Sequence, residues 1–237
     1  MYKGLIRRCK IMIVTSLFFI IVLGIAMIVY PGGNQFDTNS THYNFVLNYL
    51  SDLGSSHTIS GKDNTISKIL FVTAFGAFGM ILVYFSKIWW AMDLDVINKR
   101  VTGYFSKIFL IISGIGFIAL AFTPINVFAD LHLLFLGSAF ISFSIWLILI
   151  LLLQNSNEKI KLLFSYNLVN LVIIICYLFI IFTFSKPNSE EELEFYTISQ
   201  MIAFVFTAVN LFIQSVGIMH FLKTTDFRRS GIRNFYV

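Results

Sequence analysis

Four side chains suited to acid–base, nucleophilic or metal chemistry lie within one short segment: Ser51, Asp52, Ser55 and His57. A serine with an acid and a histidine nearby is typical of a nucleophilic or metal-assisted site. The same residues also suit an ordinary loop, in which Ser51 and Asp52 form the wet face of a short helix and His57 lies in its solvated exit. Both interpretations stay open, because polar loop residues are common but also concentrate function.

A second acid and histidine, Asp130 and His132, stand at the start of a later apolar segment. They are predicted to lie on the same side of the membrane as Asp52 and His57, where they can join Asp52 or His57 in a site at the membrane boundary. In the alternative, Asp130 is the N-cap of a helix and His132 is an interfacial residue. Adjacent helical positions advance by about 100°, so Asp130 and His132 converge only if Asp130 lies outside the helix.

No metal site is predicted, and no cofactor is assigned. The sequence has no H-E-x-x-H and no C-x-x-C motif, and its histidines do not fall at ligand spacing: His42, His57, His132 and His220. Membrane-embedded zinc hydrolases such as alkaline ceramidases need a serine, an aspartate and three histidines. The last predicted helix of this chain lacks the third histidine.

The elements that position these side chains are predicted to be membrane helices. The 237-residue chain is 57% hydrophobic and 12% charged, whereas a soluble domain carries about 25% charged residues. Several apolar runs reach the roughly 20 residues that cross a hydrocarbon core. We predict an all-α integral membrane bundle in a single domain, 1–237, with a long first loop at 31–68. Its six transmembrane helices are expected at about 11–30, 69–90, 104–123, 131–154, 162–184 and 198–222.

The positive residues predict the orientation of the bundle. With a cytoplasmic N-terminus, 14 of the 17 Lys and Arg residues fall on the cytoplasmic side, and only Lys62, Lys68 and Lys186 fall outside. An even number of crossings then places both termini in the cytoplasm (N-in, C-in) and the long loop outside the cell membrane. Membrane topology thus accounts for the net charge of +5, and no nucleic-acid partner is expected.

The long outer loop is expected to carry a short amphipathic helix on the outer membrane surface. Apolar residues recur there at helical spacing, with polar residues toward the other side: Val46, Leu47, Leu50 and Leu53 against Asn44, Asn48, Ser51 and Asp52. A separate acidic run, from Glu190 to Glu194, is either a solvated loop or the first turn of the last helix.

Polar residues also occur inside the predicted spans. Asn210 and Gln214 belong to a small and polar stripe in the last helix, and Asn170 of the fifth helix reaches a depth similar to that of Gln214. Hydrogen bonds between helices are one account of these residues, and a polar ligand cavity is the other. Small-residue helix faces also allow a homo-oligomer. No ionisable residue falls in the middle third of a span, which disfavours ion transport.

One motif of the loop, Leu50-Ser-Asp-Leu-Gly54, resembles an element of the bacterial and archaeal membrane family catalogued as domain of unknown function 998. The Asp130-Leu-His132 entry to the fourth helix is similar to that family as well. A related Ser-Asp-x-Gly element follows the first helix of the Frag1/DRAM-like six-helix membrane proteins. The resemblance implies a six-helix bundle without an established activity. It also indicates which positions to test: Ser51, Asp52, Gly54, Asp130 and His132.

Two functions suit an outer pocket covered by the 41–57 segment and bounded by the outer ends of the fourth and sixth helices. In the first, the pocket binds a membrane lipid or stabilises a membrane assembly, with ligand-binding candidates His57, Asn210 and Gln214. In the second, the protein is a membrane-embedded lipid hydrolase or transferase, with or without a metal ion in its chemistry. The candidate catalytic residues are then Ser51, Asp52, Asp130 and His132.

Overall fold

The computed structural model describes residues 2–91, 97–154, 161–183 and 186–224. These residues form one 3-10 helix, η1 (Leu50–Gly54), and seven α-helices: α1 (Tyr2–Ile28), α2 (Thr65–Phe85), α3 (Lys87–Ala91), α4 (Ile97–Ala121), α5 (Ala129–Gln154), α6 (Lys161–Thr183) and α7 (Glu190–Thr224). All except η1 and α3 are long and apolar enough to cross a membrane, so the predicted six-helix architecture is confirmed. The described residues contain no strand beyond an isolated bridge between His57 and Asp63.

Four of the six spanning helices, α1, α4, α5 and α7, are longer than the apolar runs that predicted them. α1 begins at Tyr2 rather than at 11, and α7 begins at Glu190 rather than at 198. The early start of α7 has a local cause, because the Ser189 hydroxyl accepts the Glu192 backbone N–H at 3.2 Å, as an N-cap does. Acidic residues in the first turn also suit the positive end of the helix dipole. The acidic run is therefore helical, which was one of its two interpretations.

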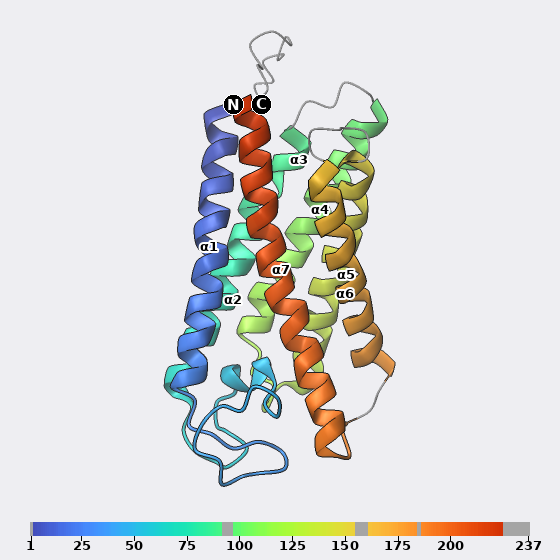
Figure 1. Cartoon of the computed structure of the whole chain (residues 1–237). Helices are drawn as coiled ribbons and strands as arrows, with labels where there is room; N and C mark the ends of the chain where they lie inside the picture. The colour runs from blue at the N-terminus through green and yellow to red at the C-terminus, as the bar shows by residue number, and fades with distance from the viewer. Residues whose placement is uncertain (1, 92–96, 155–160, 184–185, 225–237) are drawn as a thin grey trace.

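The six long helices stand side by side, with α1 beginning and α7 ending at the same end of the bundle (Figure 1). α5 contacts α4 and α6, α2 contacts α1 and α4, and α7 contacts α1 and α6. Within its most apolar part α5 is the most buried of the six and α6 the least. The core of the bundle is thus built around α5.

Aromatic rings from four helices pack together in the core. The ring centroid of Phe204 in α7 lies 5.1 Å from that of Phe75 in α2 and 4.9 Å from that of Phe140 in α5. Phe117 of α4 lies 5.4 Å from Phe140. Aromatic pairs favour edge-to-face contacts of this kind, and these contacts fix the relative positions of α2, α4, α5 and α7.

Two glycines allow α2 and α4 to approach closely. A β-carbon on Gly79 would lie 2.5 Å from the Gly114 carbonyl oxygen, and one on Gly114 would lie 2.6 Å from the Gly79 oxygen. Small residues at this crossing therefore serve packing within one chain. A homo-oligomer through small-residue faces stays a prediction.

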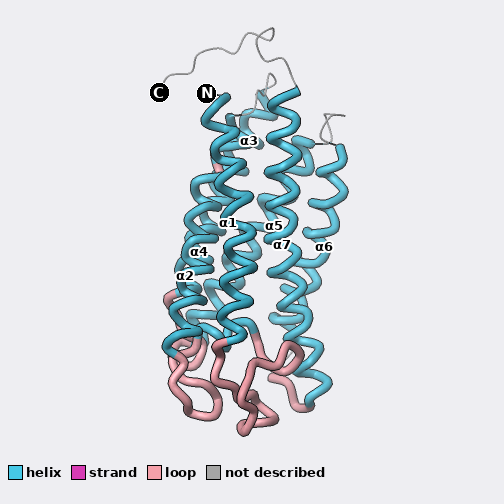
Figure 2. The backbone as a smooth tube through the Cα atoms, turned by 60° about the vertical axis from the view of Figure 1, so that its left-hand side comes forward, coloured by secondary structure: helices cyan, strands magenta, loops and turns pink. Residues whose placement is uncertain are grey.

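Residues 31–64, which we call the cap, cover the end of the bundle opposite to the start of α1 (Figure 2). The helical part of the cap is η1, and all five residues of η1 are buried. The prediction of an amphipathic helix with a wet face on the membrane surface is therefore wrong. The prediction fails because η1 packs against α2 and α7, so that no face of η1 is left to water.

Candidate functional site

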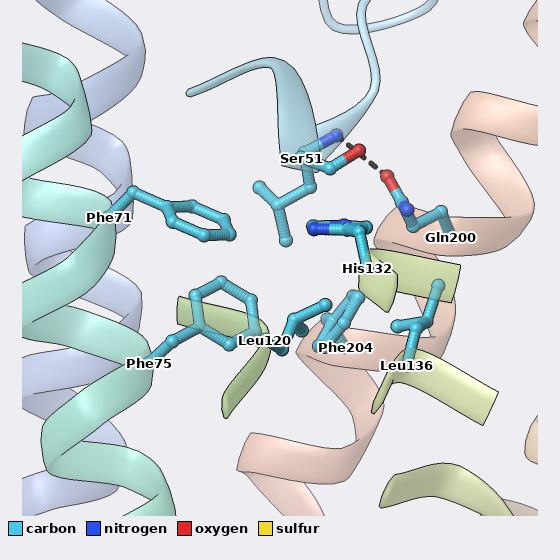
Figure 3. A pocket seen from close by; sticks show the side chains of 9 residues that line it. Ser51, Phe71, Phe75, Leu120, His132, Leu136, Gln200 and Phe204 are labelled. Atoms are coloured by element: carbon cyan, nitrogen blue, oxygen red, sulfur yellow. Dashed lines mark hydrogen bonds between the residues drawn. The ribbon is translucent and has the colours of Figure 1, made fainter. Parts of the chain in front are cut away.

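A narrow pocket lies between the cap and the bundle (Figure 3). Three of its side chains are polar, namely Ser51 of the cap, His132 of α5 and Gln200 of α7. The others are apolar: Leu50, Phe71, Phe75, Leu120, Leu136 and Phe204. The polar side chains lie together at the cap side of the pocket (Figure 3). The space between the side chains is nowhere wide enough for a water molecule.

η1 reaches this position by close packing against α2. Gly54 lies against the ring of Phe71, where a β-carbon on residue 54 would come within 2.6 Å of the Phe71 Cδ1 atom. Leu53 is fully buried, and its carbonyl oxygen accepts hydrogen bonds from Asn64 Nδ2 at 3.1 Å and from Ser67 Oγ at 3.3 Å. Residues 53 and 54 thus place Ser51 at the pocket.

Asp52 is buried within the cap and does not line the pocket. Its Oδ2 atom accepts the Asn48 Nδ2 hydrogen at 3.1 Å and the Tyr49 backbone N–H at 2.9 Å. Burial raises the pKa of the Asp52 carboxyl to about 6, although both hydrogen bonds act to lower it. The predicted place of Asp52 on a wet face is wrong, because its carboxylate satisfies the backbone at the start of η1 instead.

Buried asparagines hold the rest of the cap together. Asn34 Oδ1 accepts two backbone N–H groups of its own turn, and Asn48 Nδ2 donates to the Gly33 carbonyl at 2.9 Å. Asn64 Nδ2 lies within 3.2 Å of three carbonyl oxygens of the segment 52–55. These residues were not among the predicted site residues. The asparagine-rich composition of the loop was the available signal, since an asparagine side chain imitates backbone partners in turns.

His132 and Asp130 lie in different surroundings. Asp130 is exposed in the first turn of α5, whereas His132 is 2% exposed. The Nδ1 atom of His132 is 2.6 Å from the Thr123 carbonyl oxygen. Because a carbonyl oxygen only accepts, Nδ1 carries the hydrogen, and Nε2 of the neutral ring carries the free electron pair. Asp130 therefore does not join His132 in a site, in keeping with the helical spacing.

The remaining members of the 51–57 cluster also separate. His57 is exposed and pairs through its backbone with Asp63 in the isolated bridge. Ser55 is buried, and its carbonyl oxygen accepts a hydrogen bond from Asn64. Only Ser51 of the four cluster residues lines the pocket. The proposed convergence of His57 with Asp52 or His132 is thus absent from this structure.

Gln200 connects the cap, the pocket and α6, and it was not among the predicted site residues. Its Oε1 atom accepts the Leu50 backbone N–H at 2.7 Å, and its Nε2 donates to the Tyr177 hydroxyl at 3.2 Å. Nearby, the Thr197 hydroxyl donates to the Val46 carbonyl oxygen at 2.5 Å. A sequence signal existed, because Gln200 falls at helical spacing with the small and polar stripe of the last helix.

Asn210 and Gln214 do not line this pocket. At ~1.5 Å per residue, they lie about 15 Å or more along α7 from Gln200. They belong instead to a buried polar cluster between α5, α6 and α7. Asn167 Oδ1 accepts hydrogen bonds there from Asn210 Nδ2 at 3.0 Å and from Gln214 Nε2. Of the two accounts of these residues, hydrogen bonds between helices are present.

The pocket offers a hydroxyl, an imidazole and a carboxamide next to a hydrocarbon slot. Among the residues that the structure describes, no three His, Cys, Asp or Glu side chains gather closely enough to hold a metal ion. The arrangement suits a molecule with a small polar part and an apolar part, since pockets use few polar groups to orient a mostly apolar ligand.

Comparison of the chain with protein-family models, with curated protein sequences and with solved structures finds no match. The resemblance carried by residues 50–54 and 130–132 therefore stays a prediction. A function for this chain rests on the geometry of the pocket and the cap.

Proposed function

We propose that the protein is a multi-pass membrane protein that binds a membrane lipid in the pocket beneath the cap. One observation carries the proposal: Ser51, His132 and Gln200 gather at the cap side, and hydrocarbon side chains line the part that leads into the bundle. A lipid is divided in the same way, with ester and hydroxyl groups at the membrane boundary and chains in the interior. The polar side chains then orient the lipid, and the apolar ones hold part of a chain.

In this proposal the cap faces the outside of the cell membrane and both termini face the cytoplasm. The distribution of Lys and Arg supports this orientation, with 14 of 17 on the cytoplasmic side. The cap then lies at the level of the outer headgroups, and the lipid comes from the outer leaflet.

Binding of an acyl chain requires the pocket to widen. The space between the lining side chains is not wide enough for a water molecule in this structure, and an acyl chain is wider than that. Hydrogen bonds join the cap to α7 and to the segment before it, among them those from Leu50 to Gln200, from Thr197 to Val46 and from Gln35 to the Pro187 carbonyl. Outward movement of η1 that breaks the first of these bonds frees the Gln200 side chain for the lipid.

Lipid retention tests the proposal. Leu136→Trp fills the apolar part of the pocket, and Leu134→Trp adds the same side chain on the exposed face of α5, where Leu134 is 60% exposed. We expect native mass spectrometry of the purified chain to show a retained lipid in the native protein and in Leu134→Trp, and at least about tenfold less in Leu136→Trp. Thermal unfolding checks that both variants are folded. Equal lipid retention in two folded variants would overturn the proposal.

One observation favours a second function, hydrolysis or transfer on a lipid ester. The bond from His132 Nδ1 to Thr123 leaves Nε2 as a base in the same pocket as the Ser51 hydroxyl. A base beside a hydroxyl is the arrangement that activates a serine nucleophile. Turnover of phospholipid esters in nanodiscs that is lost in Ser51→Ala, with lipid retention unchanged, would establish this function. Retention without turnover leaves binding alone.

A further inference from the structure

Three carboxamides form a closed ring of hydrogen bonds between α5, α6 and α7. Gln154 Nε2 donates to Gln214 Oε1 at 3.4 Å, Gln214 Nε2 donates to Asn167 Oδ1, and Asn167 Nδ2 donates to Gln154 Oε1 at 2.7 Å. All three side chains are fully buried. Because each amide donates to one neighbour and accepts from another, turning one of them over alone would bring like atoms together, so the three orientations are coupled.

The orientation of Asn210 is coupled to that of the ring. In this structure Asn167 presents an oxygen and Asn210 presents its Nδ2 group, which lies 3.0 Å away; turning the ring and Asn210 over together would only exchange which atom of Asn210 is unpaired. The Oδ1 atom of Asn210 is then left buried without a hydrogen-bond partner. An unpaired acceptor is costly within a membrane, where no bulk water reaches it.

Asn170 of α6 leaves a second polar atom unpaired. Its Oδ1 accepts the Thr207 hydroxyl at 3.4 Å, and its Nδ2 is buried without a partner. The Thr207 hydroxyl can also accept a hydrogen bond. Turning the Asn170 amide over therefore only exchanges an unpaired nitrogen for an unpaired oxygen. In either orientation, Asn170 needs one more partner.

The two unpaired atoms belong to neighbouring pairs of the same helix contact. Asn167 meets Asn210, and Asn170 meets Thr207. Within each helix the two members are three residues apart, and such residues lie about 5–6 Å from each other on one face. The two contacts therefore follow each other along the interface of α6 and α7, and both unpaired atoms belong to this one stretch of it.

We propose that one buried water molecule binds between α6 and α7, where it donates a hydrogen bond to Asn210 Oδ1 and pairs with the free amide group of Asn170. The Thr207 hydroxyl is its third neighbour, since buried waters make about three hydrogen bonds to otherwise unsatisfied groups. Every side chain of the site is neutral and carries a hydrogen-bonding group, so the ligand is an uncharged hydroxyl compound such as water. The site is independent of the lipid pocket.

Water-to-amide magnetisation transfer tests the site on the native chain. The full chain with ¹⁵N-labelled asparagine is studied in nanodiscs, and the side-chain signals are assigned by their loss in Asn170→Leu and Asn167→Leu. We expect transfer from water to the Asn170 Nδ2 protons. The Asn167 Nδ2 group, which donates to Gln154 at 2.7 Å, is the control. It is expected to show little magnetisation transfer from water. Absence of transfer at Asn170 would overturn the proposal.

A double-variant cycle gives a second test. Asn170→Leu and Asn210→Leu each remove one partner of the water, and the double variant removes the whole site. A shared water makes the fall in Tm of the double variant smaller than the sum of the two single falls. Additive falls would count against the site. Asn170→Leu combined with Ser51→Ala in the cap is the control pair, for which additivity is expected.

Discussion

The backbone N–H of Leu50 donates a hydrogen bond to the side-chain oxygen of Gln200 across 2.7 Å. This bond joins η1 to α7 at the polar side of the pocket, and the amide nitrogen of Gln200 continues to Tyr177 of α6. One side chain therefore connects the cap with two helices. The position of η1 over the pocket is expected to depend on it.

Replacement of Gln200 by Leu leaves the buried Leu50 N–H without an acceptor, which costs about 1–3 kcal/mol. We expect amide hydrogen exchange across residues 46–54 to become faster, by about tenfold for each 1.4 kcal/mol. Tyr177→Phe removes only the partner of Gln200 Nε2 and is the control, with exchange in the cap close to that of the native chain. Unchanged exchange in Gln200→Leu would show that the bond does not hold η1.

Gly54→Ala is expected to destabilise the protein because its β-carbon would meet the Phe71 ring. Forcing an extra carbon into a packed contact costs about 1–3 kcal/mol. Gly76→Ala is the matched control, since a β-carbon there meets nothing within 4 Å and alanine favours a helix. Thermal unfolding should give a Tm below that of the native chain for Gly54→Ala but not for Gly76→Ala. A Tm equal to that of Gly76→Ala would argue against the close packing of η1 on α2.

Asp52 is expected to make the cap more stable in acid. Burial raises the pKa of its carboxyl from 3.8 to about 6 in the folded chain, so the folded state binds the proton more tightly than the unfolded state. The resulting stabilisation, roughly 3 kcal/mol, is fully present below the unfolded pKa and is lost as the pH rises through about 6. Asp52→Asn keeps an oxygen acceptor without the charge and should remove this pH dependence.

Unfolding measured from pH 4 to pH 8 checks this expectation. The native chain should lose stability over that interval, relative to Asp52→Asn, and the two should differ most near pH 7. Parallel pH profiles would mean that the Asp52 carboxyl titrates equally in the folded and unfolded chains.

The proposed orientation predicts which positions a membrane-impermeant maleimide reaches. In a chain with both native cysteines replaced by serine, His57→Cys should be labelled from outside intact cells, because His57 is exposed in the cap. Lys223→Cys, exposed at the far end of α7, should be labelled only after the membrane is opened. The reverse pattern would place the cap in the cytoplasm.

The six spans were predictable because length and apolar content alone identify them, as the matching of α5 (Ala129–Gln154) with the expected 131–154 shows. The helix ends were less predictable from the sequence. The Ser189 cap, for example, extends α7 through an acidic turn that has no apolar signal. Asp52 was misplaced because periodicity describes neighbours along the chain. Its burial depends on Asn48 and on packing against distant helices.

The site was predictable in part, through single residues rather than through their grouping. Ser51 and His132 were candidates from the sequence and both line the pocket, whereas the candidates His57 and Asp130 lie on the surface. Gln200 was missed because a glutamine in an apolar helix has many roles, and only the fold brings it to Leu50. Long-range contacts of this kind carry no local sequence pattern.

Photo-crosslinking with a phospholipid that carries a diazirine in its acyl chain tests lipid binding beneath the cap most directly. Phe75 and Phe204 are buried and line the pocket, whereas Val172 and Phe182 of α6 are 53% and 65% exposed and open to any surrounding lipid. The proposal predicts crosslinks on α2 and α7 at or next to the two buried phenylalanines, reduced in Leu136→Trp and retained in Leu134→Trp. Crosslinks confined to exposed positions such as those of α6 would contradict it.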